Sequence, residues 1–135
     1  MKTPPDIFLR SDLHLFIWKP RGVLNEKVIN QLIAFLREEE AMADAHRLRF
    51  TDTSELTAIE LNFRYVFHVA LHRRLTRVGR PPIKSAFYVE DPGFEHYFKL
   101  HELLTDHSSL EVKIFDSRED AAKWLEAPVE ALQTP

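Results

Sequence analysis

Residues 110–125 read LEVKIFDSREDAAKWL, and this stretch decides the fold class. Apolar and charged residues alternate from Leu110 to Phe115, which is typical of a β-strand with one covered face. Asp116 and Ser117 then offer side-chain oxygens that can cap a helix, and the apolar residues that follow have helical spacing. The stretch therefore predicts a strand that leads through a tight turn into an α-helix, the repeating unit of α/β proteins.

The segments just upstream have the same organisation. Ile83 to Val89 ends in the apolar run AFYV, as expected of a central strand with both faces covered. Asp91 is suited to cap a helix, and Pro92 is suited to its first position. Together they predict a helix through Leu104. His46 to Phe50 predicts another, shorter strand.

A longer helix is expected between these two strands. Thr57 and Glu60 have the spacing of a capping box, in which each side chain bonds the other residue's backbone N–H. We therefore predict that a helix begins at Thr57, continues to about Val78 and ends at Gly79.

The first part of the chain predicts a hairpin followed by a helix. Ile7 to Leu9 and Leu13 to Trp18 are rich in β-branched and aromatic residues, and the polar residues 10–12 separate them. Residues 19–22 interrupt the second strand, and Asn25 caps an amphipathic helix.

The predicted order is therefore β-β-α-β-α-β-α-β-α. Parallel strands joined by right-handed helical crossovers accommodate this order. We expect an α/β fold with a mixed, mostly parallel sheet of about five strands and about four helices. Residues 1–135 are expected to form a single domain whose tail frays after residue 127.

Composition excludes several classes of function. With 18 basic and 21 acidic residues, the formal net charge is −3, so we expect no nucleic-acid partner. The absence of cysteine excludes disulfides, thiolate nucleophiles and cysteine zinc sites. With only three glycines, neither a Walker loop nor a dinucleotide-binding motif can be written. Neither a leader peptide nor a run of ~20 apolar residues occurs, so we expect a cytoplasmic protein without a transmembrane segment.

Catalytic and metal-binding motifs are also missing. His101 begins like a zincin helix, but Thr105 stands where the second histidine ligand is required. His68 and His72 are four residues apart and could approach one metal ion, yet no neighbouring acid supplies a third ligand. We interpret them as part of a polar helix stripe. The sequence predicts no enzyme, no catalytic residue, no metal site and no cofactor.

The order of elements, Gly22 before the first helix, the Asp52 loop after the third strand and the ending VKIFDSREDAAKWL (112–125) resemble the SpoIIAA-like, or STAS-type, family. The ending is similar to the uncharacterised bacterial branch of that family. The resemblance implies a small non-enzymatic module that binds protein partners or nucleotides, as anti-sigma-factor antagonists do. It also implies a distant fold relation to lipid-carrying Sec14-type domains. The antagonists carry a phosphorylatable Asp-Ser-Ser-Gly at the start of the second helix, whereas residues 57–60 here read TAIE, so their phosphoserine switch is not implied.

The loop from Thr51 to Glu55 is the candidate site. It follows a predicted parallel strand and precedes a predicted helix start, where open α/β sheets hold ligands. An ordinary turn with a helix cap is the alternative interpretation. The candidate partner- or ligand-binding residues are Thr51, Asp52, Thr53, Ser54, Thr57 and Glu60.

Two groups of charges are interpreted as solvated. The run from Arg37 to Glu40 is expected to be an exposed helix end. The basic cluster is expected to complement a helix C-terminus, with an anionic partner surface as the alternative. It comprises His72, Arg73, Arg74, Arg77, Arg80 and Lys84.

Three functions remain open from the sequence, and the least favoured is a hydrolase or other enzyme that uses scattered residues such as His14, Asp52 and Glu60. The family resemblance favours a regulatory or protein-interaction module without catalysis. Apolar residues on both sides of the strands and around the second helix suggest a carrier or sensor of an apolar, lipid-like ligand as the alternative. Cover by the protein's own helices or a homodimer contact also explains these residues.

Overall fold

The computed structural model describes residues 6–42 and 45–134. The strands are β1 (Ile7–Arg10), β2 (Leu15–Trp18), β3 (Gly22–Asn25), β4 (Leu48–Asp52), β5 (Leu56–Glu60), β6 (Ile83–Tyr88) and β7 (Leu110–Phe115). The helices are α1 (Glu26–Glu40), α2 (Phe63–Thr76), α3 (Pro92–Thr105) and α4 (Arg118–Leu125), with two 3-10 helices, η1 (Ser11–Leu13) and η2 (Val129–Leu132).

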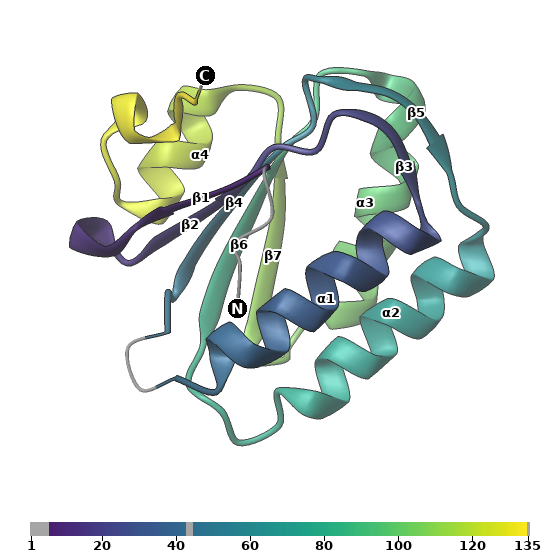
Figure 1. Ribbon diagram of the computed structural model, residues 1–135, viewed down its shortest axis with the longest axis horizontal. Coiled ribbons are helices and arrows are strands. Elements are labelled where there is room, and N and C mark those ends of the chain that lie inside the picture. Colours follow the sequence, from purple (N-terminus) through teal and green to yellow (C-terminus); the bar gives the residue numbers. More distant parts are fainter. Residues whose placement is uncertain (1–5, 43–44, 135) are drawn as a thin grey trace.

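Five strands form the central sheet in the order β1-β2-β4-β6-β7 (Figure 1). β1 and β2 pair antiparallel, and the other neighbours pair in parallel. The predicted hairpin, the mostly parallel sheet and the four α-helices are thus confirmed. The caps at Asn25, Asp91 and Ser117 are confirmed as well, since each side chain accepts a hydrogen bond from the first turn of its helix.

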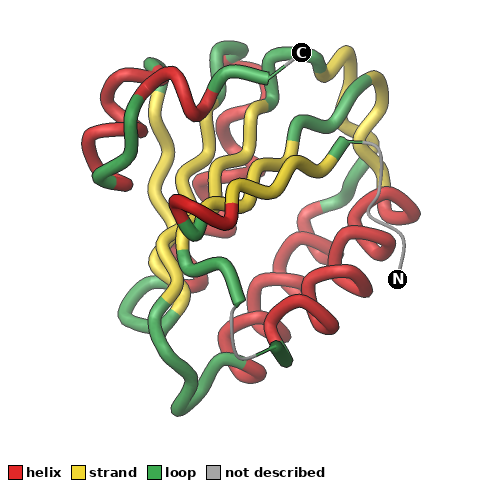
Figure 2. The backbone as a smooth tube through the Cα atoms, turned by 60° about the vertical axis from the view of Figure 1, so that its left-hand side comes forward, coloured by secondary structure: helices red, strands yellow, loops and turns green. Residues whose placement is uncertain are grey.

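Helices cover both faces of this sheet. α4 and η2 lie on one face, whereas α1, α2 and α3 lie on the other (Figure 1), and Figure 2 shows the same layers from another side. Successive side chains of β4 point to opposite faces of the sheet, so they pack against different helix layers. Phe50 is fully buried in the cluster under α4. Arg49 and Thr51 line the space under α1, α2 and α3.

The predicted helix start at Thr57 is wrong. Leu56–Glu60 is strand β5, which pairs in parallel with β3, and α2 begins after Asn62, whose Oδ1 accepts from Tyr65 N at 2.8 Å. A capping box satisfies two backbone amides, whereas strand pairing satisfies a ladder of them and also buries Leu56. The long-range pairing therefore outweighs the local signal.

The partner strand β3 was not predicted either, because Pro20 and Gly22 were interpreted as a break before the helix. Gly22 has φ of 74°, a left-handed conformation that glycine adopts without steric cost. Its N–H donates to Glu55 O at 3.1 Å, which brings the start of β3 beside β5. The glycine thus begins a strand rather than ending one.

The tail after residue 127 does not fray as expected. Residues 129–132 form η2, and Leu132 is fully buried together with Ala131. Both pack in the cluster that contains Phe50 and Leu125. The burial of these apolar side chains explains why the segment stays on the sheet.

Candidate functional site

A cavity of about 120 Å³ lies between the sheet and the layer of α1, α2 and α3. Most of its wall is carbon. The wall includes Leu32 and Leu36 of α1, Val66 and Val69 of α2, and Phe98 of α3. An engineered core cavity of about 150 Å³ stays dry and binds benzene, so the volume here is that of a small apolar ligand.

One polar part of the wall, called here the arginine end, comprises Arg49, Arg73 and Ser85, and Glu40 binds both arginines. Arg49 on β4 and Ser85 on β6 are register partners in neighbouring strands. Arg73 comes from α2 and Glu40 from the last turn of α1. Four separate elements thus bring charge and a hydroxyl group together at the cavity.

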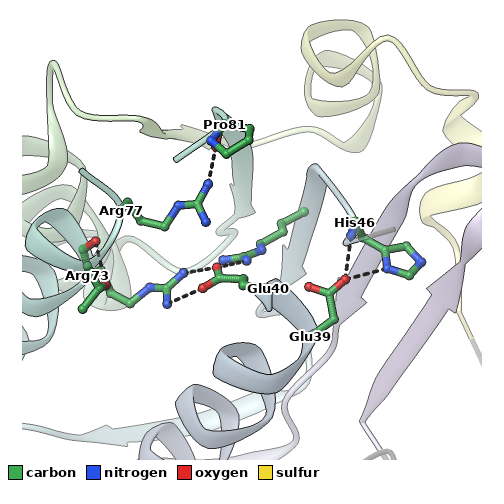
Figure 3. Close-up of polar contacts among 8 residues, drawn as sticks. Glu39, Glu40, His46, Arg73, Arg77 and Pro81 are labelled. Carbon is green, nitrogen blue, oxygen red and sulfur yellow. Dashed lines mark hydrogen bonds and ion pairs between the residues drawn. The ribbon is translucent and has the colours of Figure 1, made fainter. Parts of the chain in front are cut away.

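Glu40 is the shared acceptor of the two arginines. Arg73 donates from Nη1 to Oε1 at 3.0 Å and from Nη2 to Oε2 at 2.5 Å (Figure 3). Arg49 Nη2 donates to the same Oε2. The side chains of Glu40, Arg49 and Arg73 are 9%, 7% and 6% exposed, so this is a buried ion network.

Burial alone raises the pKa of Glu40, but hydrogen bonds from Arg73 and the charges of both arginines outweigh it and lower this pKa to about 2. Burial lowers the pKa of Arg49 to about 10, against the opposing charge of Glu40. Both groups are therefore ionised at neutral pH. Because two ionised guanidinium groups then face one carboxylate, the arginine end has a net positive charge.

Two more groups add to the charge around this network. Arg77 is 2% exposed, and its guanidinium donates to the Pro81 carbonyl. Glu39 accepts from His46 at the backbone N (2.6 Å) and at Nδ1 (2.7 Å), as Figure 3 shows. Within residues 6–42 and 45–134, Arg49 Nε and Arg77 Nε are buried donors without a hydrogen-bond partner. An orphaned buried donor is uncommon in proteins.

His101 of α3 also lines the cavity. Burial, followed by the charge of Arg73, lowers the pKa of His101 to about 4. The imidazole is therefore neutral at physiological pH, and it packs edge-on against Phe87 at 5.9 Å between ring centroids.

Polar contacts join α1 and α2 alongside the cavity. Tyr65 Oη donates to Asn30 Oδ1 at 2.6 Å. Arg37 Nη2 lies 2.9 Å from His72 Nε2. Together with the Glu40 network, these contacts hold the two helices at a fixed spacing over the cavity.

The predicted site residues are only partly brought together. Thr51 lines the cavity, whereas Asp52, one residue later, lies on the opposite face and is 1% exposed. Asp52 accepts from Arg118 Nη2 at 2.9 Å and from Ser54 N at 2.9 Å. Thr53 Oγ1 donates to the Tyr88 carbonyl at 2.7 Å.

The Asp52 contacts form a closed network at the carboxyl end of the sheet. Burial raises the pKa of Asp52, but hydrogen bonds from Ser54 and the Arg118 cation give a net lowering. The Arg118 guanidinium lies 4.4 Å from the ring centroid of Tyr88. Asp52 thus forms a turn with Ser54 and anchors the start of α4 through Arg118. The helix cap of the alternative interpretation does not occur here, because strand β5 follows the loop. Thr57 and Glu60 are exposed on β5 and take part in neither network.

The important residues that sequence reasoning missed are charged. Glu40 and Arg73 were interpreted as solvated, and the structure corrects this because each neutralises the other inside the fold. Arg49 offered a signal: a charged residue stands between Leu48 and Phe50 in a strand that helices cover on both faces. A buried charge requires a partner, so Arg49 pointed to a buried acid.

Comparisons with known proteins support the fold. No protein-family model matches the chain, and no curated protein matches it. The crystal structure of an uncharacterized protein of the DUF3478 family from Shewanella loihica PV-4, which has a SpoIIAA-like fold, is similar to this chain. The similarity covers 82% of this chain and 83% of the other, with 20% sequence identity and a TM-score of 0.51.

The chain has a SpoIIAA-like fold. Within this SpoIIAA-like fold, α2 starts later than the sequence predicted, and residues 61–66 around its start read LNFRYV, without serine or threonine. The described part of the chain contains no helix long and apolar enough to cross a membrane. The same residues contain no group of three or more histidine or acidic side chains placed to hold a metal ion.

Proposed function

We propose that this protein is a non-catalytic binding module that holds a small apolar ligand in the cavity under α1, α2 and α3. The observation that carries the proposal is the cavity itself, with about 120 Å³ of space and a largely carbon wall. Of the functions that the sequence left open, this is the carrier or sensor. The distant fold relation to Sec14-type lipid carriers favours the same choice.

A ligand that fills this space makes van der Waals contacts with its largely carbon wall, and this wall exists only in the folded protein. Such a ligand therefore binds the folded state selectively and stabilises it.

Benzene is a suitable first probe because its size matches the cavity. Val69→Phe places extra carbon inside the cavity, since Val69 lines it. Val78→Phe is the matched control, because it adds the same side chain at an exposed position. We expect saturating benzene to raise the melting temperature of the wild type and Val78→Phe, and to have no effect on Val69→Phe. An unchanged wild type, or equal stabilisation of Val69→Phe, would contradict the proposal.

A protein-interaction role remains the second candidate, and an exposed apolar stripe on α2 favours it. The exposed fractions are 53% for Phe63, 44% for Phe67, 41% for Leu71 and 62% for Leu75. Their four-residue spacing places them on one side of the helix. Self-association is the simplest case, and sedimentation velocity tests it. A dimer that Leu71→Glu converts to a monomer supports this role, whereas a monomeric wild type removes the homodimer.

A further inference from the structure

The arginine end of the cavity contains more positive than negative charge. Arg49 and Arg73 line the cavity, and Arg77, which does not line it, is buried near Glu40 and Arg73. Both Glu40 and Glu39 act electrostatically on Arg49, and they are the acids of this network. The three guanidinium groups therefore exceed the two carboxylates by one.

A specific donor accompanies this charge. Arg49 Nε is buried and has no hydrogen-bond partner among the described residues, while Arg49 Nη2 is held by Glu40. Nε is itself closed off from the cavity space, so the part of the guanidinium group that lines the wall is the part available to a ligand. Arg49 lines the cavity, and its Cζ lies 5.9 Å from the ring centroid of Phe16, another wall residue.

We propose that the ligand of this cavity is a small organic carboxylate whose apolar body fills the carbon-lined space and whose anionic group binds at Arg49. This inference rests on the proposed function and adds the chemical class of the ligand. The carboxylate pairs with the Arg49 guanidinium group, which lines the cavity, and compensates the surplus positive charge. Charge-assisted hydrogen bonds of this kind are about twice as strong as neutral ones.

The geometry also limits the size and polarity of the ligand. A cavity of about 120 Å³ accommodates a body of about six carbon atoms, by comparison with the cavity that holds benzene. Ser85, the register partner of Arg49, brings a hydroxyl that can donate to the same anion. Leu36 and Val66, among other wall residues, provide only carbon.

Benzoate and benzamide test the assignment, because they share the ring and differ in charge. We expect the wild type to bind benzoate at least about tenfold more tightly than benzamide in calorimetric titrations at neutral pH and low salt. Equal affinities would overturn the inference. Benzene, measured in parallel, separates the two proposals: if benzene binds and benzoate has no advantage, only the carboxylate assignment fails, and if none of the three binds, the proposed function fails with it.

Arg49→Lys tests the residue. Lysine keeps the positive charge but lacks the planar guanidinium group with its several fixed donors. We expect this variant to lose severalfold more affinity for benzoate than for benzene. Arg80→Lys, at an exposed position, is the matched control and should bind both as the wild type does. Unchanged benzoate affinity in Arg49→Lys would overturn the role of Arg49. The comparison of ligands on the wild type decides the carboxylate class even if Arg49→Lys does not fold.

Discussion

Replacement of Glu40 by glutamine removes the only carboxylate that hydrogen-bonds both Arg49 and Arg73 among the described residues. Glutamine has nearly the same shape, so the change isolates the charge. Loss of one partner of a buried ion network costs about 3 to 5 kcal/mol. The pKa gives a second estimate, because its lowering from 4.5 to about 2 corresponds to about 3 kcal/mol. We therefore expect Glu40→Gln to lower the free energy of unfolding by about 3 kcal/mol at pH 7.

Urea denaturation followed by tryptophan fluorescence measures this difference. Glu38→Gln, two residues away and exposed, is the matched control and should change stability by less than about 0.5 kcal/mol. The pKa of Glu40 is lower in the folded state, so its contribution is complete above pH 4.5 and is lost as the pH falls toward 2. Glu40→Gln should lack this part of the acid dependence. A cost below about 1 kcal/mol, or an unchanged acid dependence, would refute the reasoning.

Three further predictions concern the helix start, the tail and the cavity histidine, and urea denaturation checks each. Asn62→Ala should lower the free energy of unfolding by about 1 kcal/mol, because it removes the α2 cap. Thr57→Ala should lower it by less than about 0.5 kcal/mol. The reverse order of the two effects would indicate that the helix begins at Thr57. Leu132→Ala should lower the free energy of unfolding by about 2 to 5 kcal/mol, since the Leu132 side chain is fully buried. A change near zero would mean that the tail is frayed. The pKa of His101 is lowered from 6.5 to about 4, so the unfolded chain binds a proton there before the folded chain does, and stability falls as the pH decreases through this interval. Between pH 6.5 and 4, the free energy of unfolding should therefore fall less in His101→Gln than in the wild type, and the difference should reach up to about 3 kcal/mol. Identical dependence of stability on pH in the two proteins would contradict this.

The sequence predicted those parts of the fold that depend on local pattern. Leu110–Phe115 and the helix after Ser117 were predicted because strand alternation and a cap are encoded in neighbouring residues. β3 and β5 were missed because neither is stable without the other, and their pairing joins segments more than thirty residues apart. The capping-box signal at Thr57 then led to the wrong element.

In the candidate site, too, the sequence predicted local contacts but not contacts between distant segments. Asp52 and its turn with Ser54 were found because both residues lie in one loop, yet the partner that closes the network, Arg118, comes from the far end of the chain. The cavity wall was not predictable, since it depends on the exact distance between the helix layer and the sheet. Of its charged residues, only Arg49 was conspicuous in the sequence.

Strand β4 places different chemistry on alternate residues, with Arg49 and Thr51 toward the cavity and Phe50 and Asp52 toward α4. This alternation makes the strand intolerant of insertion. One added residue would turn Asp52 into the cavity beside the carbon wall and push a guanidinium group under α4. Homologous chains with this binding chemistry should therefore keep the length of β4 and place their insertions and deletions in the loops that flank it.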